Sequence, residues 1–128
     1  GPRNVMNYGH SFGHAIESAT NYVIPHGVAV TIGMDVANFV AAELSISNAK
    51  HFERMHDVLH KNCSTYRYVD VDLKLMLSAL SKDKKNSATQ LRLILPDIDG
   101  CIQIGLYDNN TELSKAIDKY FDIYSGVA

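Results

Sequence analysis

The stretch "NYGHSFGHAIE", from Asn7 to Glu17, combines two histidines with glycines and an apolar pattern of helical spacing. That spacing continues beyond the stretch and predicts a helix from Gly9 to Thr20. His10 and His14 are four residues apart, so a helix places both imidazoles on one face. Such a pair can grip one divalent cation. Two buried imidazoles hydrogen-bonded to the backbone explain the spacing equally well.

His26 favours a site over two buried core histidines. It lies in a Pro-His-Gly loop, just before a long helix that we expect from Gly27 to Leu44. If the two predicted helices pack side by side, His26 returns close to His10 and His14. Glycines adjoin all three histidines and remove side-chain bulk where a ligand or another backbone approaches. Two or three histidines also leave coordination positions open, as catalytic zinc requires.

The rest of the chain predicts three more helices and one hairpin. Ser47 is the expected N-cap of a helix through about Lys61, and Asp70 caps another through about Ser81. The last helix is expected from Thr111 to Tyr124. The strand-like runs "LRLILP" and "CIQIGLY" flank the turn signal "DIDG" and predict a β-hairpin. The fold class is therefore mainly α, a multi-helix domain with one small β-hairpin.

Three further histidines lie on the helix that begins near Ser47. Its predicted buried stripe consists of Phe52, Met55, Val58 and Leu59. The histidines at positions 51, 56 and 60 fall largely off that stripe, without neighbouring glycines or anion-binding groups. We interpret them as surface residues.

Composition excludes several classes of protein. The chain has 128 residues, of which 46% are hydrophobic, enough for one domain with a core. Its net charge of -2 gives no nucleic-acid footprint, and no apolar run reaches the roughly 18 residues of a membrane span. Cys63 and Cys101 lack metal-like spacing and are expected to be reduced thiols of a cytoplasmic protein. Since the chain begins Gly-Pro-Arg just before its densest motif, we expect a piece of something longer.

Several cationic and amide side chains are candidates for binding an anion. Arg3 and Asn7 precede His10, and an arginine fork with an amide is typical around a phosphate or carboxylate. Lys84 and Lys85 lie in a polar loop that could clamp an anion. A frayed terminal arginine and a solvated lysine loop are the alternatives.

Three blocks of the sequence resemble a known family. "RNVMNYGHSFGHAIE", "HGVAVTIGM" and "DKKNSATQLRLILPDIDG" are similar, in order and spacing, to the C-terminal domain of the 3-dehydroquinate synthases, which belong to the sugar-phosphate cyclases. The resemblance implies a two-domain enzyme with an N-terminal NAD-binding domain. Residues 1–128 would be part of its helical metal- and substrate-binding domain. No GxGxxG-like fingerprint occurs here, so we expect no cofactor-binding residues in this chain.

The resemblance also implies a role for each candidate residue. His10 and His26 match the two histidine ligands of Zn²⁺ or Co²⁺, whereas the family's third ligand is a glutamate on an earlier helix that this chain lacks. His14 matches a histidine at the phosphate end of the substrate. Arg3 and Asn7 match substrate-binding positions and, with His14, form the implied catalytic set.

The lysine of the family's "DKK" block helps to hold the substrate phosphate. Lys84 matches it, with Lys85 as a close rival.

The implied reaction converts 3-deoxy-arabino-heptulosonate 7-phosphate to 3-dehydroquinate and phosphate, a lyase step of the shikimate pathway. Such an enzyme uses NAD and a divalent metal, takes a small sugar phosphate as substrate, and is a cytoplasmic homodimer as a full-length protein. We expect no nucleic-acid or membrane partner. The isolated 128-residue chain is expected to be inactive, because the NAD domain and one metal ligand are missing.

Val28 departs from the family pattern, which usually reads His-Gly-Glu-Ala-Val after the second metal ligand. This departure leaves open another sugar-phosphate cyclase, of the 2-deoxy-scyllo-inosose or 2-epi-5-epi-valiolone synthase type. A helical metal-binding module without catalysis is the third interpretation.

Overall fold

The computed structural model describes residues 8–62, 66, 69–82 and 89–124, and these form five helices and one hairpin. The elements in chain order are α2 (His10–Ala19), α3 (His26–Glu43), α4 (Ala49–Asn62), α5 (Leu73–Lys82), β1 (Gln90–Pro96), β2 (Ile102–Asp108) and α6 (Thr111–Tyr124). The expected mainly helical fold with one hairpin is confirmed, and every predicted element is present. None of the described helices combines the length and apolar character that crossing a membrane requires.

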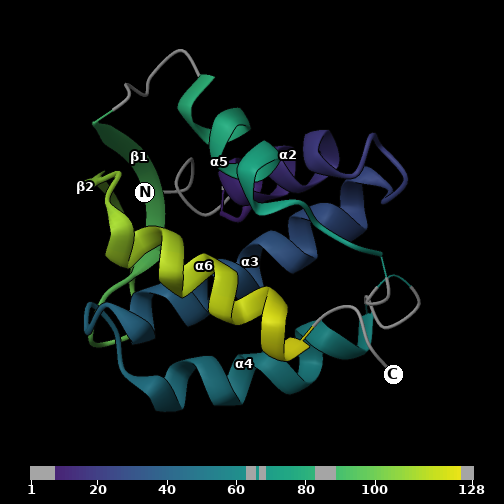
Figure 1. Cartoon of the computed structure of the whole chain (residues 1–128). Helices are drawn as coiled ribbons and strands as arrows, with labels where there is room; N and C mark the ends of the chain where they lie inside the picture. Colours follow the sequence, from purple (N-terminus) through teal and green to yellow (C-terminus); the bar gives the residue numbers. More distant parts are fainter. Residues whose placement is uncertain (1–7, 63–65, 67–68, 83–88, 125–128) are drawn as a thin grey trace.

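Helix α3 is the centre of the fold. It packs against α2, α4, α6 and β1, and Figure 1 shows these elements arranged around it. Every residue from 35 to 41 is buried, including the polar Asp35 and Asn38. A helix that is covered on all sides needs small and apolar residues around its whole circumference, and the sequence of α3 supplies them.

Helices α2 and α3 touch backbone to backbone at three glycines. A Cβ atom added to Gly33 would lie 2.2 Å from the Gly9 carbonyl oxygen and 2.7 Å from the Gly13 nitrogen. A Cβ on Gly13 would lie 3.0 Å from the Cα of Val30. These glycines therefore make room for another backbone, which was one of the two expected uses. Around Gly27, by contrast, an added Cβ meets no described atom within 4 Å.

Two predicted helix caps are wrong by one or two residues. Helix α4 is capped by Asn48, whose Oδ1 accepts the backbone N–H of Lys50 at 2.9 Å. Ser47 is instead buried, and its own N–H bonds to the carbonyl of Ala41, so it closes α3 and does not open α4. Helix α5 is capped by Asp72, which accepts the N–H of Leu75, and the predicted cap Asp70 lies outside it.

The hairpin closes one side of the core. β1 and β2 pair antiparallel, from Gln90 opposite Asp108 to Pro96 opposite Ile102. Asp97 Oδ1 accepts the N–H groups of Asp99 and Cys101 and so fixes the predicted "DIDG" turn. Leu91, Leu93 and Leu95 alternate along β1 and are fully buried on its inner face. Cys101 is an exposed free thiol, and Cys63 lies outside the described residues.

The buried stripe of α4 differs from the predicted one. Phe52 and Leu59 are buried as expected, but Val58 is 61% exposed. His56 takes the inward position between them, where it meets the buried carboxylate of Asp35 at 2.7 Å. The interpretation of His56 as a surface residue is therefore wrong. The apolar pattern missed it because the residue that His56 faces on α3 is polar.

We expect Gly33→Ala to lower the free energy of unfolding by about 1–3 kcal/mol, because the new methyl group must push two backbones apart. Urea unfolding followed by circular dichroism measures this loss. Gly27→Ala is the matched control, since it makes the same change on the same helix in open space. Equal stability of the two variants would contradict the close contact of α2 and α3.

Candidate functional site

Three imidazoles meet where α2 packs against the start of α3. The ring centroids of His10 and His14 are 5.7 Å apart, those of His10 and His26 are 5.6 Å apart, and those of His14 and His26 are 5.8 Å apart. The expected return of His26 to the first pair is confirmed. We call these three side chains the histidine triangle.

The chain between the two helices holds His26 in place. Asn21 and Tyr22 adopt positive φ angles of 54° and 62°, and the N–H of Tyr22 bonds to the carbonyl of Glu17 at 2.8 Å. Ile24 is buried and anchors the loop, after which the extended Pro25 leads directly into α3. This compact reversal puts the first residue of α3 beside the middle of α2.

A hydrogen bond to α3 fixes the start of α2. Tyr8 is buried just before Gly9, and its hydroxyl donates to the side-chain oxygen of Asn38 on α3. Burial raises the pKa of Tyr8 far above its usual value, so its hydroxyl keeps the proton that it donates. His10 therefore follows a turn that is anchored on the central helix.

Glu17 is a member of the site that the sequence analysis missed. Its carboxylate oxygen Oε1 lies 2.8 Å from Nδ1 of His26. Glu17 is 12% exposed and His26 is 56% exposed, so the pair lies at the edge of the triangle. An Nδ1–H that donates to Glu17 leaves Nε2 of His26 as a lone-pair donor for a cation. The available signal was spacing, because Glu17 follows His14 by three residues.

The electrostatics of the triangle favour the neutral form of the His10 imidazole. Burial lowers the pKa of His10, the neighbouring His14 and His26 lower it further, and Glu17 opposes them. A metal needs the lone pair of the neutral ring, so a lowered pKa makes His10 a better ligand at neutral pH.

The donors at the triangle suit a divalent ion. His14, Glu17 and His26 offer candidate ligand atoms that all lie within 4.8 Å of one another, a set that does not include His10. Imidazole nitrogens with one carboxylate are the donors that zinc-class ions accept. The donor types at the triangle therefore fit the metal that the resemblance implies. The converging ligand atoms come from His14, Glu17 and His26, so the set contains the expected ligand His26 but has His14 in place of the expected His10.

An open groove runs beside His14, between α2 and α5. It has a volume of about 280 Å³, and its polar lining comes from Ser11, His14, Ser18 and Lys82. Two hydroxyls, an imidazole and an ammonium group suit an anion. Lys82 ends α5 and precedes Lys84 by two positions in the sequence. Lys84 and Lys85 lie outside the described residues, as do Arg3 and Asn7.

Comparisons with known proteins identify the family of the chain. The 3-dehydroquinate synthase C-terminal family matches residues 1–86. The 3-dehydroquinate synthase of Helicobacter pylori strain P12 is 34% identical over 116 residues, which cover 90% of this chain and 34% of that protein. The enzyme of Rhodopirellula baltica is 40% identical over 98 residues, covering 76% of this chain and 26% of the relative. The chain thus spans about a quarter to a third of the length of these curated relatives.

A solved structure shares the fold. The crystal structure of 2-deoxy-scyllo-inosose synthase, complexed with carbaglucose-6-phosphate, NAD⁺ and Co²⁺, superimposes with a TM-score of 0.73 at 22% identity. The match covers 90% of this chain and 34% of that one. With the family match and the identity to the curated relatives, the conclusion is that this chain belongs to the 3-dehydroquinate synthase C-terminal family.

Proposed function

We propose that this chain is the metal- and substrate-binding part of a 3-dehydroquinate synthase. The longer enzyme would convert 3-deoxy-arabino-heptulosonate 7-phosphate to 3-dehydroquinate and phosphate. The observation that carries the proposal is the convergence of His10, His14 and His26 within a chain of this family. NAD would bind to a domain outside residues 1–128, since the described residues form a helical unit with one hairpin.

His10 and His26 are the proposed histidine ligands of a Zn²⁺ or Co²⁺ ion. Such an ion, when bound, supplies Lewis acidity that favours loss of a proton from a substrate hydroxyl. Glu17 holds the ring of His26 at a fixed angle through its 2.8 Å contact, so Nε2 is presented to the cation. In the longer protein a glutamate from an earlier helix would complete the ligand set.

His14 is the proposed contact to the substrate phosphate. It lines the groove between α2 and α5, with the ammonium group of Lys82 at the same groove. Lys84 and Lys85 follow Lys82 in the sequence after the single residue Asp83, and they are proposed to extend this cationic edge toward the phosphate. Arg3 and Asn7 are proposed to bind and orient the rest of the substrate.

The setting that we propose for the full-length enzyme follows the resemblance. It acts on a small sugar phosphate as a homodimer in the cytoplasm. The isolated chain is proposed to be inactive, because hydride transfer belongs to the nicotinamide cofactor and the present helices provide no dinucleotide fingerprint.

A second sugar-phosphate cyclase activity is favoured by one specific position. Val28 stands where the family usually has glutamate, and its side chain packs against the hydrophobic core. A carboxylate that other members present at this position is therefore absent here. The competing substrates are glucose 6-phosphate and sedoheptulose 7-phosphate.

An assay of the full-length protein separates the two activities. With NAD and Co²⁺, we expect phosphate release from 3-deoxy-arabino-heptulosonate 7-phosphate and none above background from the two competing sugar phosphates. Preferred turnover of glucose 6-phosphate or sedoheptulose 7-phosphate would assign the protein to another branch of the cyclases.

Replacing His26 by alanine in the full-length protein should lower kcat by more than about 100-fold, because loss of a metal ligand costs more than the 10–100-fold seen for outer-shell partners. Bound metal, measured by atomic emission, should fall in parallel. His51→Ala is the control, since His51 lies on α4 and contacts Arg54. Full activity of His26→Ala would remove the metal role from the triangle.

We expect Glu17→Gln to weaken Co²⁺ binding at the triangle by about 10-fold, because the amide orients the ring of His26 less firmly than a carboxylate. Titration calorimetry gives the affinity. Glu43→Gln is the control, because Glu43 pairs with Lys119 on α6. Unchanged affinity in Glu17→Gln would show that its contact with His26 has no part in metal binding.

A further inference from the structure

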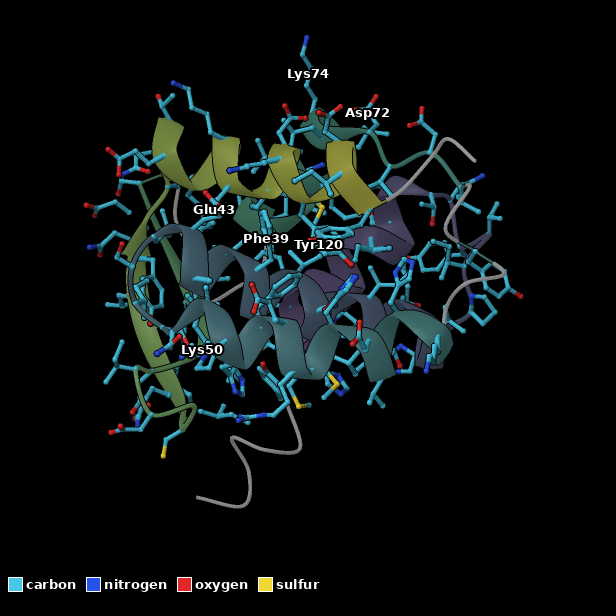
Figure 2. All side chains as sticks on the ribbon, turned by 90° about the horizontal axis from the view of Figure 1, so that it is seen from below. Phe39, Glu43, Lys50, Asp72, Lys74 and Tyr120 are labelled. Atoms are coloured by element: carbon cyan, nitrogen blue, oxygen red, sulfur yellow. The ribbon has the colours of Figure 1, made fainter. Side chains whose placement is uncertain are left out.

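A second group of titratable side chains lies on α3, α4 and α6, away from the histidine triangle. Its centre is Asp35, which has no exposed surface. The carboxylate oxygen Oδ2 accepts a hydrogen bond from the hydroxyl of Tyr120 at 2.7 Å, and Nδ1 of His56 lies 2.7 Å from the same oxygen. Figure 2 shows Tyr120 in the space between α6 and α4, where it faces the ring of Phe39.

His60 brings a second imidazole to this group. It follows His56 by one helical turn, and the two ring centroids are 4.8 Å apart. Candidate ligand atoms of Asp35, His56 and His60 all lie within 4.8 Å of one another. Both histidines are half-buried, so solvent reaches the group from the side of α4.

The two carboxylate oxygens of Asp35 differ in their hydrogen bonding. Oδ2 has two donors, while Oδ1 is buried and has no hydrogen-bond partner among the described residues. Burial raises the pKa of this carboxyl group, and Tyr120, His56 and His60 oppose that rise. A buried carboxylate is costly unless donors or a cation compensate for the lost water, and here one of its two oxygens lacks compensation.

We propose that Asp35, His56 and His60 form a second divalent-metal site for an ion of the zinc class. Two imidazoles and one carboxylate are a common ligand set for such ions, and a water molecule would take the fourth position. Asp35 lies nine residues beyond His26 on α3, roughly 13 Å along the helix axis, so one ion cannot serve both sites.

Metal binding requires only small movements of the Asp35, His56 and His60 side chains. A tetrahedral ion separates its ligand atoms by roughly 3.3 Å, so the contact between His56 and Asp35 opens by a few tenths of an ångström. The proton on Nδ1 of His56 leaves to solvent, and the ion takes its place between the nitrogen and Oδ2 of Asp35. Because the two carboxylate oxygens share one negative charge, the positive ion also compensates the charge on the unpaired Oδ1. His60 turns about its side-chain bonds to direct a nitrogen at the same point. The bound ion then ties α4 to the central helix.

The test uses Co²⁺ as the only added ligand, followed by its visible absorption and by calorimetry. The background variant of the chain carries His14→Gln and His26→Gln, which remove two donors of the triangle. We expect this variant to bind one equivalent of Co²⁺ and its Tm to rise with the metal concentration, since the ion binds the folded state.

Adding His60→Gln to the background should weaken Co²⁺ binding by at least about 10-fold and reduce the rise in Tm at a given Co²⁺ concentration. This change keeps the contact of His56 with Asp35, so the fold should be retained, as circular dichroism can check. His51→Gln on the same helix is the matched control and should leave the Co²⁺ affinity unchanged. Absence of Co²⁺ binding in the background variant, or equal affinity with and without His60, would overturn the proposal.

These outcomes are separate from the proposed enzyme function. Failure of the second site leaves the triangle and the cyclase activity untouched. Loss of cyclase activity in the full-length protein would likewise leave the Co²⁺ titration of the background variant unaffected.

Discussion

The direct contact of two helix backbones governs the rest of this structure. Gly9, Gly13 and Gly33 allow α2 and α3 to approach until backbone atoms touch, with no side chains between them. At that distance His10 and His14, one turn apart on α2, come beside the first residue of α3. Larger side chains at these three positions would push α2 and α3 apart and would separate His26 from His10 and His14. The same glycines therefore determine both how the core packs and where a cation can bind.

The central helix is unusual because its segment from residue 35 to residue 41 is buried on all sides and yet partly polar. Asn38 receives the hydroxyl of Tyr8 on the side of α2, and Asp35 receives His56 and Tyr120 on the sides of α4 and α6. Each polar group thus joins α3 to a different neighbour. Burial alone would oppose these groups, and hydrogen bonding offsets much of that cost. Such directional contacts fix the rotation of α3 more sharply than apolar packing does.

Much of this architecture could be predicted from the sequence, because apolar spacing and turn signals are local. The last helix and its inward residues follow directly from the spacing of Leu113, Ile117 and Tyr120, and the hairpin follows from its alternating leucines and the "DIDG" turn. The return of His26 could be predicted because the loop is short and flanked by proline and glycine. Roles for Arg3, Asn7, Lys84 and Lys85 stay predictions, since these residues lie outside the described part of the chain.

Features that depend on distant pairing could not be predicted in the same way. Ser47 was a reasonable cap by residue type, but its backbone is already used to end α3. Apolar spacing assigns His56 to the surface, because its partner Asp35 is 21 positions away and polar. Local sequence alone does not reveal the role of Glu17, because its role at the site comes from the 2.8 Å contact between its carboxylate and Nδ1 of His26. In each case the deciding contact links two elements, and no single segment carries its signature.

The 56% exposure of the His26 side chain has a consequence for chemistry at the triangle. A cation held there would stand on an open face of the molecule, in contact with bulk water. Charge stabilisation is weak in so polar a medium, because the high dielectric constant of water screens it. Efficient catalysis at this face would therefore require an opposing wall that closes over the ion and shuts out the solvent. The described helices α2 and α3 provide one wall of such a site.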